Sequence, residues 1–237
     1  MRGLFLSLRW TSAAAEQGPL AEEFEFEDDI FSALDLLVIN LEERQDRLEL
    51  FAQQMHTLGI GSWQRVAATD GKANFPEMPP FFAGSLGCTM SHIDALNSIR
   101  SEGSRATVIC EDDAEFLLNK VELAKLITEF LANPKLDVLA LYGRARGGSH
   151  AISPLLRIAV GLVGRVCYVV KPHMVPILTE EFEKGIPLLK RGKRRGKGDQ
   201  MWRRLQSRRY FFATPRVTAV RNRGGFSDIE GKQLGPR

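Results

Sequence analysis

Cysteine is scarce in this chain: the 237 residues contain only Cys88, Cys110 and Cys167, and none of the three forms a CxxC pair with another. That spacing excludes a zinc ribbon, a thioredoxin-type redox motif and a disulfide-rich scaffold. We therefore expect the protein to work in a reducing compartment. Glycine-rich nucleotide motifs are also missing. Without a dinucleotide-binding glycine pattern or a P-loop, neither an NAD-type cofactor nor ATP hydrolysis is expected.

Long apolar runs are absent as well. The longest, Leu155–Val170, contains two arginines and is too short to cross a bilayer. The apolar segment Leu4–Leu8 is shorter than the core of a secretory signal, and the last residues, Pro236 and Arg237, carry no retention signal. These observations predict a cytoplasmic protein without a membrane-spanning segment.

The overall composition is that of a globular protein, with 44% hydrophobic and 26% charged residues. Charge is unevenly distributed, because eight acidic residues and no basic residue lie between Glu16 and Asp35. We expect residues 1–33 to form a loosely packed acidic arm, residues 34–230 a single domain, and residues 231–237 a tail.

Apolar runs and helical periodicity alternate along the central part of the chain. They predict strands at residues 35–40, 63–68, 106–110, 136–142, 209–213 and 216–220 with two more inside 158–170, and helices near 41–58, 86–100, 121–131, 173–184 and after 199. Residues 72–84 and 143–153 are expected to be loops. Strands that alternate with helices predict an α/β fold around a mostly parallel sheet, with an antiparallel end.

Three consecutive acids, Glu111, Asp112 and Asp113, follow the predicted strand 106–110. In extended backbone, Glu111 and Asp113 point to one side and Asp112 to the other. Open α/β sheets bind ligands at the carboxyl ends of their strands, and carboxylate oxygens suit a hard divalent cation. The alternative is an acidic loop that caps the following helix.

Two further clusters are candidates for ligand binding. The first includes Cys88, Ser91 and His92, where a helix start could bind phosphate and His92 could donate a hydrogen bond or pack as a structural residue. A Cys88–His92 nucleophile lacks a visible third partner. The second cluster, residues 38–47, follows the first strand and could meet a nucleotide, or could be an exposed helix with Glu/Arg pairs.

A basic block lies near the C-terminus: residues 190–209 contain ten basic residues and only one acid, Asp199. Such a block attracts phosphates, anionic lipid or nucleic acid, although a solvated helix face explains it equally well. Because no helix-turn-helix or RNA-recognition pattern accompanies it, we expect no nucleic-acid partner.

Together, these motifs resemble glycosyltransferase family 25, the family of bacterial lipooligosaccharide β-galactosyltransferases and procollagen galactosyltransferases. The resemblance covers about residues 35–230 and rests on motifs that occur in the family's order. They are Ile39-Asn40-Leu41 with Arg44, Asp46 and Arg47; Ala68 with Asp70-Gly71; Gly84, Gly87-Cys88, Ser91-His92 and Ala95; Glu111-Asp112-Asp113; and weaker matches at Tyr168, Asp199 and Ser227-Asp228-Ile229.

The resemblance implies a GT-A-like fold, a UDP-sugar donor (most often UDP-galactose), Mn²⁺ or Mg²⁺, and inversion at the anomeric carbon. It implies the following site: Glu111, Asp112 and Asp113 at the metal, with Asp113 the best ligand; Asn40, Leu41, Arg44, Ala68 and Asp70 around the nucleotide; and Ser91 and His92 near the diphosphate or sugar. Inversion requires a base, for which Asp199 is the candidate, unless it only anchors its helix.

The expected acceptor is a saccharide or glycolipid such as lipopolysaccharide, and residues 190–209 would then face an anionic membrane or a lipid-linked sugar phosphate. Three alternatives remain at this point. They are a glycosyltransferase-like binding protein without catalysis, a nucleic-acid-binding protein that uses residues 190–209, and a two-carboxylate glycoside hydrolase that needs neither UDP nor metal.

Overall fold

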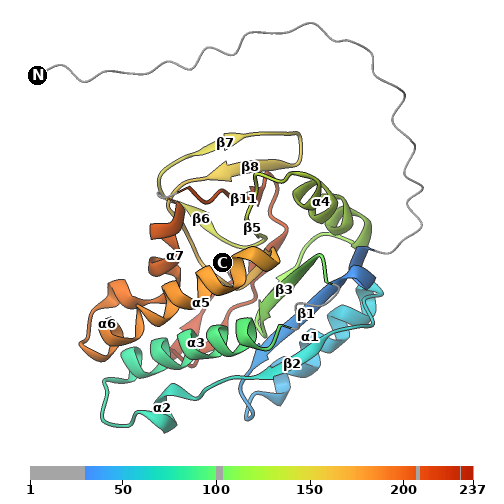
Figure 1. Cartoon of the computed structure of the whole chain (residues 1–237). Helices are drawn as coiled ribbons and strands as arrows, with labels where there is room; N and C mark the ends of the chain where they lie inside the picture. Colours follow the sequence, from blue (N-terminus) through green and yellow to red (C-terminus); the bar gives the residue numbers. More distant parts are fainter. Residues whose placement is uncertain (1–29, 100–103, 207–208, 230, 237) are drawn as a thin grey trace, which may run out of the picture.

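The computed structural model describes residues 30–99, 104–206, 209–229 and 231–236 (Figure 1). Most of the expected acidic arm therefore lies outside the described residues. Its last four residues form a 3-10 turn, η1 (Ile30–Ala33), which buries Phe31 in the core.

Helices and strands alternate over residues 34–140 as predicted, whereas residues 144–170 and 212–234 contain runs of strands without helices between them. The helices are α1 (Gln45–Leu58), α2 (Gly71–Asn74), α3 (Pro80–Asn97), α4 (Lys120–Ala132), α5 (Val175–Glu183), α6 (Ile186–Lys190) and α7 (Gly198–Gln206), with 3-10 turns η2 (Pro172–Met174) and η3 (Arg194–Gly196). The strands are β1 (Leu34–Asn40), β2 (Gln64–Ala67), β3 (Ala106–Glu111), β4 (Ala114–Phe116), β5 (Val138–Ala140), β6 (Arg144–Ala145), β7 (Ser149–Ala151), β8 (Leu156–Ala159), β9 (Leu162–Val163), β10 (Cys167–Val170), β11 (Phe212–Pro215), β12 (Val220–Asn222), β13 (Gly225–Ser227) and β14 (Lys232–Leu234).

Eight of these strands form the central sheet, in the order β2-β1-β3-β10-β5-β11-β8-β7. Pairing directions show that only β10 and β8 run against the other six. The mostly parallel sheet is confirmed, but the antiparallel strands are not confined to one end, because β10 lies between β3 and β5. The register pairs Ile39 with Glu111, so β1 and β3 end side by side.

Helices cover both faces of the sheet, because β1 is buried on both of its sides. Leu36 and Val38 pack into one hydrophobic core with α1 and α4, whereas Leu37 and Ile39 pack into a second core with α3, α5 and α7. Figure 1 shows these two helical layers on either side of the sheet. A strand buried on both faces reads as a continuous apolar run, which is why its position could be predicted.

Two helix boundaries differ from the expected ones. Helix α1 ends as predicted at Gly59, whose φ of 66° is left-handed, but it begins at Gln45, which leaves Leu41 outside the helix. Helix α3 begins at Pro80 rather than near residue 86. Proline suits the first helical position because its fixed φ matches the helix and its missing N–H would have no helical partner there.

Other expected boundaries also shift. Residues 72–84 are not one loop, since α2 and the start of α3 occupy most of them, and residues 143–153 contain β6 and β7. The strands predicted at residues 209–213 and 216–220 fall at Phe212–Pro215 and Val220–Asn222, a few residues further along, and β13 and β14 follow them without having been predicted. The prolines of residues 72–84 and the glycines of residues 143–153 predicted loops, but both segments also contain short helices or strands. Among the described residues, no helix has the length and hydropathy needed to cross a membrane.

Candidate active site

A cavity of about 180 Å³ lies at the carboxyl ends of β1 and β3, walled by α3, residues 68–72 and the C-terminal segment 227–229. Most predicted site residues line it: Leu41, Ala68, Asp70, Ser91, His92, Glu111, Asp112 and Asp113. Asn40, Arg44 and Asp199 do not line it. A second cavity of about 150 Å³ shares Arg47, Glu111 and Asp113 with the first. The two cavities therefore meet at the acidic residues that follow β3.

Asp112 directs its carboxylate toward residues of β1 and α1. Its carboxylate accepts hydrogen bonds from Asn40 Nδ2 at 2.8 Å and from Arg47 Nη1 at 3.0 Å. Burial raises the pKa of Asp112 to about 6, and the Arg47 charge opposes this shift. Asn40 also donates to the Arg44 carbonyl and accepts from Arg65 Nε, so its amide holds Asp112 and the chain beyond β1 in place.

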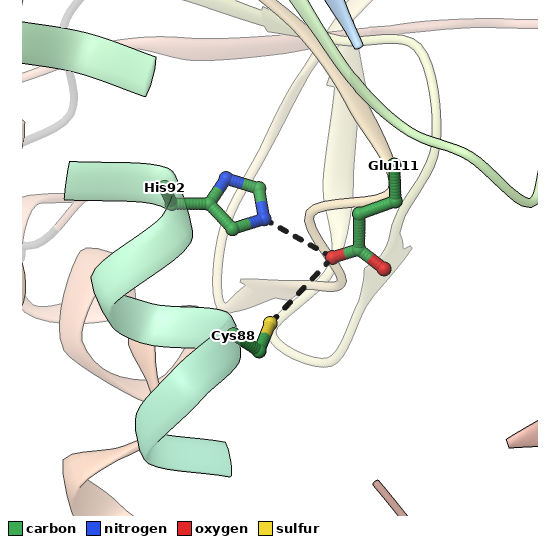
Figure 2. Close-up of side chains that lie close together, drawn as sticks. All are labelled: Cys88, His92 and Glu111. Carbon is green, nitrogen blue, oxygen red and sulfur yellow. Dashed lines mark hydrogen bonds and ion pairs between the residues drawn. The ribbon is translucent and has the colours of Figure 1, made fainter. Parts of the chain in front are cut away.

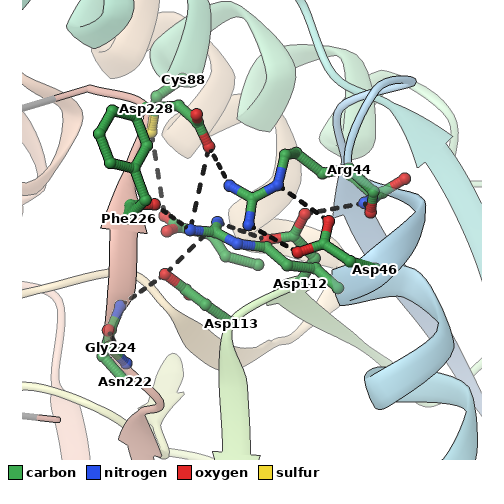
Figure 3. Close-up of polar contacts among 12 residues, drawn as sticks. Arg44, Asp46, Cys88, Asp112, Asp113, Asn222, Gly224, Phe226 and Asp228 are labelled. Carbon is green, nitrogen blue, oxygen red and sulfur yellow. Dashed lines mark hydrogen bonds and ion pairs between the residues drawn. The ribbon is translucent and has the colours of Figure 1, made fainter. Parts of the chain in front are cut away.

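Asp113 keeps one oxygen without a partner. Its Oδ2 accepts a 2.8 Å hydrogen bond from Asn222 on β12, whereas its Oδ1 is buried and has no hydrogen-bond partner among the described residues (Figure 3). Burial raises the pKa of Asp113 to about 6, and the nearby Glu111 carboxylate adds to the shift. A buried carboxylate oxygen without a donor is a site where a cation or a proton would be stabilised.

Glu111 is held by α3 (Figure 2). His92 Nε2 lies 3.1 Å from Glu111 Oε1. His92 Nδ1 lies 3.1 Å from the Tyr168 hydroxyl on β10. His92 is completely buried, and desolvation lowers its pKa well below the usual value, so the imidazole is neutral. A neutral imidazole has one N–H, so it donates to one of these partners and accepts from the other. His92 therefore positions the Glu111 carboxylate.

Cys88 lies one helical turn before His92, with its Sγ 3.9 Å from Glu111 Oε1. The ligand atoms of Cys88, His92 and Glu111 lie within 4.8 Å of one another, a set whose sulfur and nitrogen donors would suit zinc better than Mn²⁺. Burial raises the pKa of Cys88 to about 12, and both His92 nitrogens face other groups. This arrangement does not support the Cys88–His92 nucleophile that the sequence left open, because the thiol stays protonated and His92 is bonded to Tyr168 and Glu111 instead of to Cys88.

Asp199 lies at the start of α7, and its charge reaches the same group of acids. Its electrostatic repulsion helps to raise the pKa of Glu111, whose largest perturbation is burial. Asp199 Oδ1 is buried without a hydrogen-bond partner among the described residues. The buried Arg165 side chain opposes the repulsion by lowering the pKa of Glu111, and its Nη2 donates to Cys88 Sγ at 3.4 Å. Gly198 makes this possible, since a Cβ there would collide with the guanidinium.

Arg44, at the N-cap of α1, and Arg47, in its first turn, both contact the C-terminal segment, and Figure 3 labels Arg44 beside Asp228. Arg44 binds Asp46 and donates from Nη1 to Asp228 Oδ2 at 2.6 Å, and Arg47 Nη2 donates to the Phe226 carbonyl at 2.5 Å. Arg47 also lies 3.9 Å from Asp113 Oδ2. Arg44 is thus placed behind the cavity wall, whereas Arg47 lines both cavities beside the acids.

The loop that carries Ala68 and Asp70 is fixed to α3 by close backbone contact. Ser91 Oγ accepts a 2.9 Å hydrogen bond from the Thr69 N–H and donates to the Gly87 carbonyl. Asp70 caps α2 by accepting from the Lys72 and Ala73 N–H groups. The side chains of Ser91 and Asp70 therefore shape the cavity wall through bonds that they already make within the protein.

Several site residues were not predicted from the sequence. Arg47 appeared only as part of a motif, Asp228 only as a weak match, and Asn222 and Arg165 gave no signal. Asn222 on β12 binds Asp113, and Arg165, in the turn before β10, acts on Glu111 electrostatically. Both lie far from the acids in sequence, so no local spacing could have predicted these interactions.

Comparison with known proteins identifies the family of the chain. Residues 33–151, half of the chain, match the family described as "Glycosyltransferase family 25 (LPS biosynthesis protein)". The chain belongs to glycosyltransferase family 25. A solved structure described as a crystal structure of a glycosyltransferase involved in the glycosylation of the major capsid of PBCV-1 is similar over 76% of this chain and 81% of that chain, with a TM-score of 0.45 and 9% identity. No curated protein matches the chain.

Proposed function

We propose that this family 25 member is an inverting, metal-dependent transferase that moves a hexose, galactose from UDP-galactose, to a saccharide or glycolipid acceptor such as lipopolysaccharide. Asp113 carries the proposal, because its Oδ1 is buried without a partner among the described residues and its neighbour is Glu111. The cavity between β1, α3 and residues 68–72 would take the nucleotide.

A metal ion would bind to two of the three acids that were predicted from the sequence as ligands. Glu111 and Asp113 would hold it, since both line the second cavity and offer the oxygen ligands that Mn²⁺ and Mg²⁺ prefer. Asp112 is the poorest ligand of the three, because Asn40 and Arg47 occupy its oxygens. When bound, a divalent cation neutralises negative charge on a diphosphate leaving group.

The chain's own residues would perform the remaining steps. Leu41, Ala68 and Asp70 line the nucleotide end, and His92 keeps Glu111 oriented. Asp199 would accept the proton of the acceptor hydroxyl, as a single displacement with inversion requires. Its unpartnered Oδ1 supports that role.

Calorimetric titration with UDP, with and without Mn²⁺, tests the donor site. We expect Asp113→Asn to lose the Mn²⁺-dependent gain in UDP affinity while its circular dichroism stays unchanged. The matched control is Asp94→Asn, which changes an exposed acid on α3 and should behave like the wild type. Equal UDP affinity with and without Mn²⁺ in the wild type would refute the metal role.

Turnover separates catalysis from binding. We expect Asp199→Asn to lower kcat by about 10²-fold or more with little change in UDP affinity, because general base catalysis contributes about 10²–10⁴-fold. A chain that binds UDP with Mn²⁺ but transfers no sugar to any acceptor would instead support a non-catalytic binding protein.

A further inference from the structure

Residues 193–197, at the centre of the basic block, form a turn whose backbone is fixed by hydrogen bonds. Residues 193–197 pack on α6, where the Lys193 N–H donates to the Leu188 carbonyl at 2.9 Å and the Gly196 N–H donates to the Lys193 carbonyl at 2.9 Å. A Cβ added at Gly196 would lie 2.5 Å from the Gly185 carbonyl oxygen, so the two backbones touch. The cations of this turn therefore project from a fixed backbone, which a merely solvated loop would not require.

Two of these cations are held against one aromatic ring. The Arg194 guanidinium carbon lies 4.7 Å from the centroid of the Phe81 ring, and Lys197 Nζ lies 5.7 Å from it. Neither side chain forms an ion pair with a described residue, although Lys197 lowers the pKa of Glu111 electrostatically. Stacking on a ring orders a cation without neutralising it, so both charges are available to a ligand.

This turn and the acids belong to one groove. Phe81 and Lys197 line the 150 Å³ cavity that contains Glu111 and Asp113, and they also line a wider cavity of about 610 Å³ that contains Arg194. The nucleotide cavity shares Glu111 and Asp113 but neither Phe81 nor Lys197. The basic groove thus reaches the acids by a route different from that of the proposed donor.

We propose that this groove is the acceptor subsite and that it takes a saccharide carrying a phosphate or carboxylate group, bound by Arg194 and Lys197. This inference rests on the proposed function, because a donor in the nucleotide cavity leaves the groove for the acceptor. An anionic group would pair with both cations at once, whereas a neutral sugar would leave them without counter-charge. Arg194 and Lys197 then select the acceptor by its charge.

The test uses the full chain and two defined probes, a heparin hexasaccharide as the anionic saccharide and maltohexaose as the neutral one. Binding is measured by titration calorimetry for the wild type and for Arg194→Gln/Lys197→Gln. The matched control, Arg191→Gln/Lys193→Gln, removes the same charge from two exposed neighbours that line none of the described cavities. UDP binding with Mn²⁺ is measured on every variant.

We expect heparin to bind at least tenfold more tightly than maltohexaose. The Arg194→Gln/Lys197→Gln variant should lose roughly tenfold or more in heparin affinity, since each charge-assisted hydrogen bond accounts for about that factor. The control should change less than about threefold, in keeping with screened surface charges. UDP affinity with Mn²⁺ should match the wild type in the control, and in Arg194→Gln/Lys197→Gln it should change less than heparin affinity, because Lys197 acts on Glu111 only through space.

Three results would overturn the inference. The two double variants could lose heparin affinity equally, or the wild type could bind heparin no more tightly than maltohexaose. In the third, Arg194→Gln/Lys197→Gln loses binding to phosphatidylserine vesicles but still binds heparin like the wild type. The last result would assign the cations to a membrane surface. Measuring UDP binding distinguishes failure of the proposed function from failure of the acceptor subsite. Failure of the wild type to bind UDP refutes the proposed function, and with it the acceptor role, whereas failure with heparin alone refutes only the acceptor subsite.

Discussion

Gly87 offers a sharp test of how α3 holds the nucleotide loop. A Cβ at this position would lie 2.5 Å from both the Gly71 nitrogen and the Thr69 carbonyl oxygen, so Gly87→Ala forces the loop away from the helix. In an exposed helix the same substitution would stabilise by roughly 1 kcal/mol, because alanine is the better helix former. Here both clashing atoms belong to backbone, and neither can rotate away.

We expect the clash to outweigh the gain in helix propensity. Overpacking typically costs about 1–3 kcal/mol, so Gly87→Ala should lower the free energy of unfolding by roughly that amount and the Tm by about 2–10 °C for a chain of this size. Urea denaturation followed by the fluorescence of Trp63 and Trp202 measures the change. Gly61→Ala is the control, since its Cβ would meet nothing within 4 Å. A Gly87→Ala protein as stable as that control would refute the proposed packing of the loop on α3.

Two further predictions concern residues around the same cavity. Ser91→Ala leaves the Thr69 N–H without its acceptor and should cost about 1–3 kcal/mol in urea denaturation, while Ser98→Ala, which loses only a local hydrogen bond near the end of α3, should cost less. Asp112 has a pKa of about 6, above its unfolded value of 3.8, so the native state binds the extra proton between these values. Its contribution to stability therefore falls as pH rises from about 4 to 6 and then levels off, and Asp112→Asn should remove this part of the slope; an unchanged slope would contradict the raised pKa.

Much of the parallel half of the sheet could be predicted because its strands are buried on both faces. The run that became β1 and the run before Glu111 are continuous apolar segments, and Gly59 marks the end of α1. The position of β10 could not be predicted, because nothing local in Cys167–Val170 distinguishes a central antiparallel strand from an edge strand. Its place depends on pairing with two strands that are distant in sequence.

Some residues of the candidate site could be predicted from local sequence patterns, and others could not. The triplet after β3 and the Ser91–His92 pair are local patterns, and the structure brings them to one cavity. Strand alternation does not explain the direction of Asp112, because β3 ends at Glu111, and Asp112 and Asp113 form a turn. The partners that define each acid are not local: Asn222 binds Asp113, Arg165 approaches Glu111, and they come from β12 and the turn before β10.

The balance of acidic and basic side chains at the end of β3 bears on both the proposed donor site and the proposed acceptor subsite. Four acids meet three cations there; the acids are Glu111, Asp112, Asp113 and Asp199, and the cations are Arg47, Arg165 and Lys197. Burial raises the pKa of each acid of the triplet despite these cations, so the pocket resists further negative charge. A diphosphate adds negative charge to this pocket, and it can enter only with a proton or a cation that compensates for it. UDP should therefore bind better with Mn²⁺ or at lower pH, and an anionic acceptor should bind to Arg194 and Lys197 rather than near the acids.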